Sequence, residues 1–169
     1  MLPGEPVKQN RFSKLKRVSG KLRRMWVGHD EPLSSEFALP RLLIVDDEAA
    51  ICFSMSEYFS LHGFKVDTAC ELDEVEKLIG TTDYRVIIQD LRLSATHDSD
   101  GLHIIKMVRD QRPNAKIIVL TAYGSTEMED EARRCGADAF LRKPKPLSQV
   151  AQVVQGLLDS SQSQAVNHA

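Results

Sequence analysis

Short apolar runs alternate with longer segments of helical period along the chain from residue 41 onward. The first run is Leu42–Val45, and similar runs occupy 86–88, 116–120 and 139–141. Runs of this kind, separated by segments of helical period, are typical of buried parallel strands and the helices that cover them. The alternation predicts an α/β fold with a doubly wound, five-stranded parallel sheet.

Ten elements follow from this pattern. Gly63, Gly80 and Gly136 each stand directly after a helical segment, where glycine commonly ends a helix. The connections between strands are expected to be right-handed crossovers. We predict strands at 41–45, 64–68, 85–89, 116–120 and 138–141, and helices at about 49–62, 71–79, 101–111, 126–135 and 147–158.

Charge divides the chain into two parts. Residues 1–40 contain eight Lys and Arg against four acidic residues, whereas the rest of the chain contains 14 basic and 20 acidic residues. Phe12–Trp26 carries a one-sided apolar face among basic residues and predicts a helix, although Gly20 interrupts it. We therefore expect a basic N-terminal extension and linker at 1–40, a folded domain at 41–158 and a polar, disordered tail at 159–169.

Three observations bear on the cellular compartment. The cysteines Cys52, Cys70 and Cys135 stand apart, without the CxxC or His spacing of a metal site, so we expect buried, reduced thiols. No segment approaches the roughly 20 apolar residues of a membrane-spanning helix. The basic N-terminus lacks the continuous apolar stretch of a secretory signal. We therefore expect a cytoplasmic protein.

Polar residues lie at or just after the ends of four of the predicted strands. Because ligands bind outside the carboxyl ends of strands in open α/β sheets, these residues should converge on one site. Three of them are carboxylates, and such oxygen ligands favour the binding of Mg²⁺ or Mn²⁺. When no cation is bound, the mutual repulsion of the carboxylates should raise the pKa of at least one of them. The residues are Asp46, Asp47, Asp90, Thr121 and Lys143.

The same residues suit phosphoryl chemistry. Asp90 can act as a nucleophile, since aspartyl phosphate is an established covalent intermediate. The hydroxyl of Thr121 and the ammonium of Lys143 can bind phosphoryl oxygens. Taken singly each residue has a common structural explanation; Asp47, for example, can simply begin a helix. Their joint position at strand ends carries the prediction of a metal and phosphoryl site.

Five segments, in the expected order and spacing, resemble the receiver domain of bacterial response regulators over about residues 41–158. The resemblance implies a flavodoxin-like fold with strand order 2-1-3-4-5. It also implies a protein that is not an ordinary enzyme and at most catalyses its own phosphorylation and dephosphorylation. The segments are LLIVDDE (42–48), DYRVIIQDLRL (83–93), DGL (100–102), IIVLTAYG (117–124) and GADAFLRKP (136–144).

The resemblance assigns a role to each residue at the strand ends. Asp90 is the phosphoacceptor, and its donor is a histidine kinase or a histidine phosphotransfer protein of a phosphorelay. The bond between Lys143 and Pro144 is expected to be cis. The other roles are metal binding by Asp46, Asp47, Asp90 and the backbone carbonyl of Arg92, phosphoryl binding by Thr121 and Lys143, and switching by Thr121 and Phe140.

The chain departs from the common pattern of that family in three respects. The loop at 91–100 is longer than usual, and Ser94 replaces a common proline. Phe140 lacks the hydroxyl of the commoner tyrosine, so an inward ring needs no hydrogen-bond partner. Arg92 and Tyr123 are bulky at positions that influence the access of water to the acyl phosphate. We therefore expect slow self-dephosphorylation.

No output domain is recognised after residue 158, so we expect the signal to pass to an unknown downstream protein by a population shift of the receiver surface. A receiver fold that signals without phosphate would lose Asp90 or Lys143, and both are present. A phosphohydrolase fits poorly because residue 48 is Glu rather than a second Asp, and an ATPase fits poorly because no GxxxxGK[ST] loop exists.

The role of the basic segment 8–26 stays open at this point. It can be an extension without a dedicated role, or it can dock on a protein or on its own acidic domain. It can also bind a membrane surface, with Phe12 and Trp26 as apolar anchors, or contact nucleic acid in a salt-dependent manner.

Overall fold

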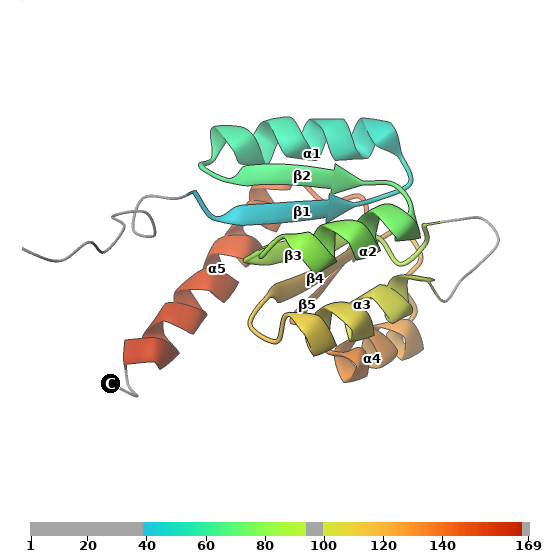
Figure 1. Ribbon diagram of the computed structural model, residues 1–169. Coiled ribbons are helices and arrows are strands. Elements are labelled where there is room, and N and C mark those ends of the chain that lie inside the picture. Colours follow the sequence, from blue (N-terminus) through green and yellow to red (C-terminus); the bar gives the residue numbers. More distant parts are fainter. Residues whose placement is uncertain (1–38, 94–99, 167–169) are drawn as a thin grey trace, which may run out of the picture. The chain divides into compact units, whose positions relative to one another are not determined.

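The structure, a computed structural model, describes residues 39–93 and 100–166 of the chain. Within these ranges, five strands form one parallel sheet with helices on both faces (Figure 1). The strands are β1 (Arg41–Val45), β2 (Lys65–Ala69), β3 (Val86–Gln89), β4 (Lys116–Thr121) and β5 (Ala139–Arg142). The helices are α1 (Ala49–Leu61), α2 (Leu72–Thr81), α3 (Asp100–Gln111), α4 (Thr126–Cys135) and α5 (Leu147–Val166).

The strands lie in the order β2-β1-β3-β4-β5, and every neighbouring pair is parallel. This confirms the doubly wound, flavodoxin-like topology that the resemblance implies. In the observed register, Val45 at the end of β1 lies beside Ala69 of β2 and Gln89 of β3. The residues that follow these three positions therefore leave the sheet at the same edge, where ligands bind in folds of this kind.

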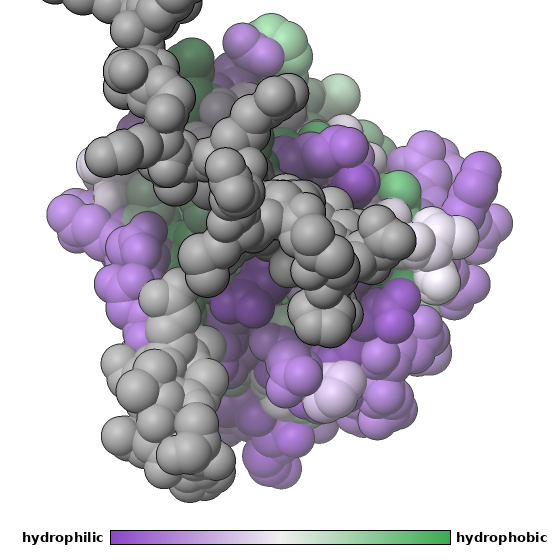
Figure 2. All heavy atoms as spheres, turned by 60° about the vertical axis from the view of Figure 1, so that its left-hand side comes forward, coloured by the Kyte–Doolittle hydropathy of each residue, from purple (hydrophilic) through white to green (hydrophobic). Residues whose placement is uncertain are grey.

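Apolar side chains are buried on both faces of the sheet. Leu43 and Val45 of β1 pack with residues of α2, α3 and α4, whereas Leu42 and Ile44 pack with residues of α1 and α5. Each such Leu or Ile stabilises the fold by about 1.5–3 kcal/mol relative to an exposed position. Burial on both faces explains why the strands are continuously apolar. The coloured surface in Figure 2 is correspondingly mainly hydrophilic.

Of the three glycines that we expect to end helices, two are confirmed in that position. Gly63 (φ +85°) and Gly136 (φ +113°) follow α1 and α4 in the left-handed region, where a side chain would be strained. Gly80 is different, because it lies within α2, which continues to Thr81. An added Cβ at Gly80 would meet no other atom, so the helix tolerates this glycine and does not require it.

The last helix is longer than predicted. Helix α5 continues past Leu158 to Val166, so the expectation of disorder is wrong for 159–166. The added turns contain mainly Ser and Gln, and neither Gly nor Pro stands between Leu157 and Val166 to interrupt the helix. The predicted end of this helix, at the apolar residue Leu158, therefore lies too early in the chain.

The predicted basic extension lies, except for its last two residues, outside the described part of the chain, as does the helix expected at 12–26. Its role therefore stays a prediction. Among the helices in the described ranges, none is long and apolar enough to cross a membrane.

Candidate functional site

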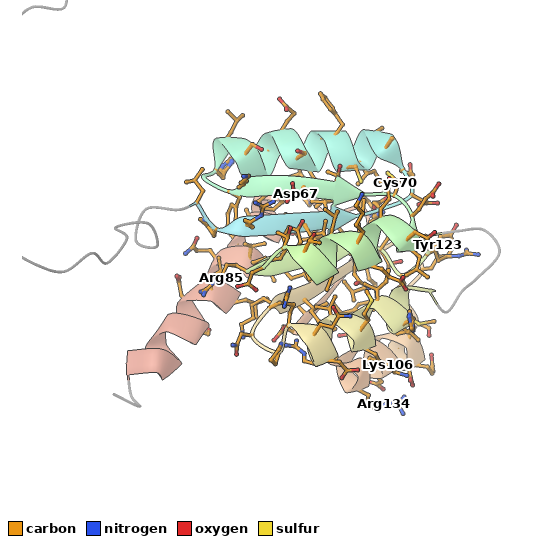
Figure 3. All side chains as sticks on the ribbon, in the orientation of Figure 1. Asp67, Cys70, Arg85, Lys106, Tyr123 and Arg134 are labelled. Atoms are coloured by element: carbon orange, nitrogen blue, oxygen red, sulfur yellow. The ribbon has the colours of Figure 1, made fainter. Side chains whose placement is uncertain are left out.

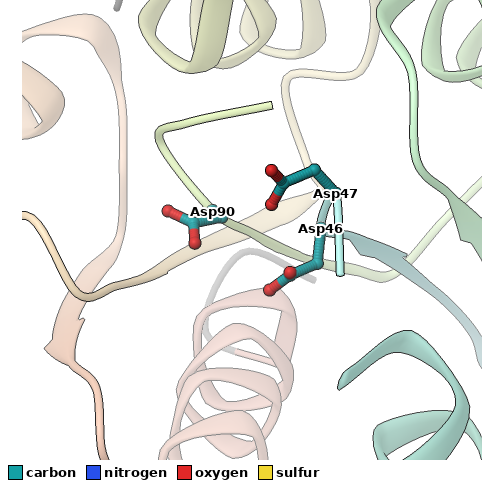
Figure 4. A group of neighbouring side chains, drawn as sticks. All are labelled: Asp46, Asp47 and Asp90. Carbon is teal, nitrogen blue, oxygen red and sulfur yellow. The ribbon is translucent and has the colours of Figure 1, made fainter. Parts of the chain in front are cut away.

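The predicted site residues come together at the carboxyl edge of the sheet. Asp46 and Asp47 follow β1, and Asp90 follows β3 (Figure 4). One carboxylate oxygen from each lies within 4.8 Å of the others. Asp46 and Asp90 are only 3% and 6% exposed, whereas Asp47 is open to solvent. Such a partial shell of hard oxygen donors fits Mg²⁺ or a similar divalent cation, which completes its ligands with phosphate oxygens and water.

Lys143 contacts both buried carboxylates. Its Nζ donates to Oδ2 of Asp46 at 2.6 Å and to Oδ2 of Asp90 at 2.8 Å. The second oxygen of each carboxylate accepts a backbone N–H from two residues further on. These donors are Glu48 for Asp46, at 3.0 Å, and Arg92 for Asp90, at 3.2 Å. These hydrogen bonds hold both carboxylates in fixed orientations.

The electrostatics of the site follow from burial and from this ion pair. Burial raises the pKa of Asp46, while the hydrogen bond from Lys143 and the N–H of Glu48 oppose the rise, and the charge of Asp90 adds to it. The sequence predicts a raised carboxylate pKa from mutual repulsion, but loss of hydration is the larger cause. Burial lowers the pKa of Lys143, but its hydrogen bonds with both carboxylates outweigh this and leave the pKa raised.

Thr121 ends the strand that lies between the strands leading to Asp90 and Lys143. It is the last residue of β4, which lies between β3 and β5 in the sheet, and its side chain is fully buried. Its Oγ1 accepts the backbone N–H of Tyr123 at 3.2 Å. Asp90, Thr121 and Lys143 therefore follow or end three consecutive strands, which brings a carboxylate, a hydroxyl and an ammonium to the same edge of the sheet.

Phe140 on β5 points inward. It is 9% exposed and packs in the core with residues of α3 and α4. A Cβ added to Gly124 would lie 2.9 Å from Cε1 of its ring, so the ring packs closely against the loop after β4. The inward position agrees with a ring that needs no hydroxyl partner. The Lys143–Pro144 bond that follows β5 is cis, as the resemblance implies.

Arg92 and Tyr123 form a pair at the mouth of the site. The Arg92 guanidinium carbon lies 4.1 Å from the centroid of the Tyr123 ring, which is a close cation–π contact. Figure 3 shows Tyr123 at the carboxyl edge of the sheet. Both residues line an open cavity of 340 Å³ together with Asp90 and Lys143. The sequence indicates that both residues are bulky, but it does not predict that their side chains contact each other. The metal role of the Arg92 carbonyl stays a prediction.

The stem of the lengthened loop is closed by contacts that sequence reasoning missed. Gln89 is fully buried, and its Nε2 donates to the carbonyl of Gly101 at 2.7 Å. The N–H of Gly101 donates to the carbonyl of Leu91 at 3.2 Å. A polar residue at the end of an otherwise apolar strand was the available signal for Gln89. Residues 94–99 of this loop, including Ser94, lie outside the described ranges.

Comparison with known sequences supports this geometry. The sequence profile of the response regulator receiver domain matches residues 42–155. Regulatory protein AtoC of Escherichia coli (strain K12) is 31% identical over 132 residues, which are 78% of this chain and 28% of AtoC. Photosynthetic apparatus regulatory protein RegA of Cereibacter sphaeroides is 30% identical over 109 residues, which are 64% of this chain and 58% of RegA. The chain therefore spans less than two thirds of these curated relatives.

Solved structures share the fold. A CheY-like response regulator receiver domain protein from Methanospirillum hungatei JF-1 is 27% identical, with a TM-score of 0.70 over 75% of this chain and 99% of that one. A response regulator from Burkholderia pseudomallei, solved with a phosphorylated aspartic acid, a calcium ion and citrate, is also 27% identical. Its TM-score is 0.65 over 77% of this chain and 75% of that one.

Proposed function

This chain belongs to the response regulator receiver domain family, and on that premise we propose that Asp90 accepts a phosphoryl group from a histidine kinase or a histidine phosphotransfer protein. The observation that best supports the proposal is the contact of Lys143 with both buried carboxylates, Asp46 and Asp90, beside the exposed Asp47. The phosphorylated aspartic acid in the similar Burkholderia pseudomallei structure is consistent with the same chemistry.

The transfer joins one oxygen of Asp90 to the donor phosphorus. The O–P bond forms as the P–N bond to the donor histidine breaks, and the imidazole leaves. Lys143, 2.8 Å from Oδ2 of Asp90, can follow the phosphoryl oxygens and neutralise their charge. When bound by Asp46, Asp47, Asp90 and the carbonyl of Arg92, Mg²⁺ or Mn²⁺ supplies further positive charge to the phosphoryl oxygens.

Thr121 and Phe140 connect this reaction to the surface. The Thr121 hydroxyl accepts the N–H of Tyr123 and is free to donate its own proton to a phosphoryl oxygen. A shift of Thr121 toward that oxygen would move the loop after β4, in which Gly124 lies close to the Phe140 ring. We infer that phosphorylation thereby favours one arrangement of β4, β5 and their helices, and that a downstream protein in the cytoplasm binds this arrangement.

The direct test uses the full chain, Mg²⁺ and a small phosphodonor such as acetyl phosphate. We expect intact mass spectrometry to show one added phosphoryl group that is absent without a divalent cation. Asp90→Asn should abolish the addition, and Asp110→Asn, an exposed residue on α3, should retain it.

Two outcomes would contradict the proposal. Retention of the added mass in Asp90→Asn would place the phosphoryl group elsewhere. No added mass with small donors and with purified histidine kinases would instead favour a receiver-fold adaptor that acts without phosphate.

A further inference from the structure

Cys52 and Cys70 both lie near the backbone of Asp46. Cys52, in the first turns of α1, is 4% exposed, and its Sγ donates to the backbone carbonyl of Asp46 at 3.3 Å. Cys70 directly follows β2 and is partly buried. The N–H of Asp46 donates to the carbonyl of Ala69, the residue before Cys70, at 3.2 Å. The backbone of Asp46 therefore connects both cysteines to the acidic site.

The two cysteines also share one apolar cluster on the same face of the sheet. Cys70 packs against the apolar cluster that contains Cys52. Burial raises the pKa of Cys52 to about 12, and the neighbouring Cys70 thiol adds to this rise. Figure 3 shows Cys70 at the carboxyl end of β2, next to the beginning of α1. The third cysteine, Cys135, is in α4 and belongs to the cluster on the opposite face of the sheet.

We propose that Cys52 and Cys70 form a site of reversible oxidation by peroxides, and that the resulting disulfide slows phosphorylation at the adjacent acidic site. The disulfide part rests only on the placement of the two thiols, while the effect on phosphorylation rests on the function proposed above. Neither thiol takes part in that function, so the pair is available for a separate role.

The unequal burial of the two residues sets the order of events. Cys70 is the more accessible, so its thiolate attacks a peroxide oxygen. The O–O bond breaks, hydroxide leaves and takes up the proton that the Cys70 thiol released, and a sulfenic acid remains. The sulfur of Cys52 then attacks the sulfur of Cys70, the S–O bond breaks, and the leaving hydroxide takes the Cys52 proton to form water. Hydrogen peroxide is thus reduced to two waters as two thiols lose two electrons. A dithiol reductant reverses the reaction.

The link to phosphorylation is the hydrogen bond from Cys52 to Asp46. A disulfide removes the S–H donor, leaves the Asp46 carbonyl without that partner, and ties α1 to the loop after β2. The segment 46–48, which carries two of the metal-binding carboxylates, lies between these fixed points. We expect phosphorylation to slow roughly fivefold or more, a change of the size caused by loss of one buried hydrogen bond.

The first test is chemical and does not depend on the function of the site. The reduced full chain is treated with hydrogen peroxide, denatured in an alkylating agent and analysed by peptide mass mapping. We expect a Cys52–Cys70 disulfide within one chain and a free, alkylated Cys135. Cys70→Ala should abolish the disulfide and Cys135→Ala should retain it. Links only to Cys135 or only between chains, or overoxidation without a link, would overturn the proposal.

The second test compares the rate of phosphorylation by acetyl phosphate before oxidation, after oxidation and after reduction with dithiothreitol. We expect oxidation to slow the phosphorylation of the wild-type protein and of Cys135→Ala, and reduction to restore the original rate. The phosphorylation rate of Cys70→Ala should not change on oxidation. An unchanged rate in a fully disulfide-bonded sample would overturn the coupling. Failure of the reduced protein to become phosphorylated would instead contradict the proposed function and leave the disulfide result intact.

Discussion

Nζ of Lys143 lies 2.8 Å from Oδ2 of Asp90, although 53 positions separate the two residues and β4 lies between their strands. The lysine side chain extends past the end of β4, where Thr121 is buried, and also contacts Asp46 after β1. One ammonium group thus connects the ends of β1, β3 and β5. The stability of this edge and its proposed chemistry therefore depend on the same positive charge.

Loss of that charge should destabilise the metal-free protein. We expect Lys143→Ala to lower the free energy of unfolding by about 2–3 kcal/mol near neutral pH, because two buried carboxylates lose their shared cationic partner. Mg²⁺ should recover part of the loss, since a cation bound by the same carboxylates stabilises the folded state. Urea unfolding with and without Mg²⁺ measures both effects. Lys106→Ala, at an exposed position on α3, is the matched control, and an equal effect of the two variants would contradict the prediction.

Part of this site could be predicted from the sequence because its signal is local. Asp46 and Asp90 each follow an apolar run, so the strand pattern alone places them at one edge of a parallel sheet. The contact of Lys143 with Asp46 could not be predicted from periodicity. It depends on the strand order, which follows from the packing of all five crossovers and which only the family resemblance supplied.

Features that depend on side-chain orientation or weak local preferences could not be predicted. The stacking of Arg92 on Tyr123 requires two rotamers in loops after different strands, and neither leaves a periodic signal. The end of α5 at Val166 lies in a polar segment, where no core-facing residue marks the boundary. The polar Gln89 stands out after an apolar run, but its partner Gly101 lies across the lengthened loop, so the contact itself could not be predicted.

The raised pKa of Asp46 predicts a specific pH dependence. Because burial raises this pKa, the folded protein keeps the Asp46 proton at pH values where the unfolded chain has lost it. The associated stability is present in full below the unfolded pKa and decreases as the pH rises through the folded pKa. Asp46→Asn removes this titration, so in metal-free buffer the variant should gain stability relative to wild type as the pH rises above about 4.

Denaturant unfolding at a series of pH values checks this expectation. Asp110→Asn, at an exposed position on α3, is the control and should follow the wild-type pH profile. Parallel profiles for Asp46→Asn and wild type would show that Asp46 titrates alike in the folded and unfolded states.

The Arg92–Tyr123 pair should slow hydrolysis of the aspartyl phosphate. The stacked side chains line the cavity that contains Asp90 and restrict the approach of water to an acyl phosphate there. We expect Arg92→Ala and Tyr123→Ala each to speed dephosphorylation roughly tenfold, the effect of removing a water-excluding contact worth about 1.4 kcal/mol. The decay of the phosphorylated mass after removal of the donor gives the rate.

Phe53→Ala, which removes an exposed aromatic side chain from α1, should leave that decay unchanged. A wild-type phosphoryl lifetime of only seconds would contradict the expectation of slow hydrolysis. Unchanged decay in both variants of the pair would show that these side chains do not limit water access.

Gly101 should be required for the close contact at the stem of the loop. A Cβ at this position would lie 2.4 Å from both Cα and the carbonyl oxygen of Leu91, and these backbone atoms cannot move aside as a flexible side chain can. We expect Gly101→Ala to destabilise the protein by about 1–3 kcal/mol, the usual cost of overpacking. Gly156→Ala in α5 is the matched control, because its Cβ would meet no other atom and helical Ala is favoured over Gly by about 0.5–1 kcal/mol. The two variants should therefore shift the urea midpoint in opposite directions, and a stabilised Gly101→Ala would show that Leu91 and the start of α3 are not in close contact.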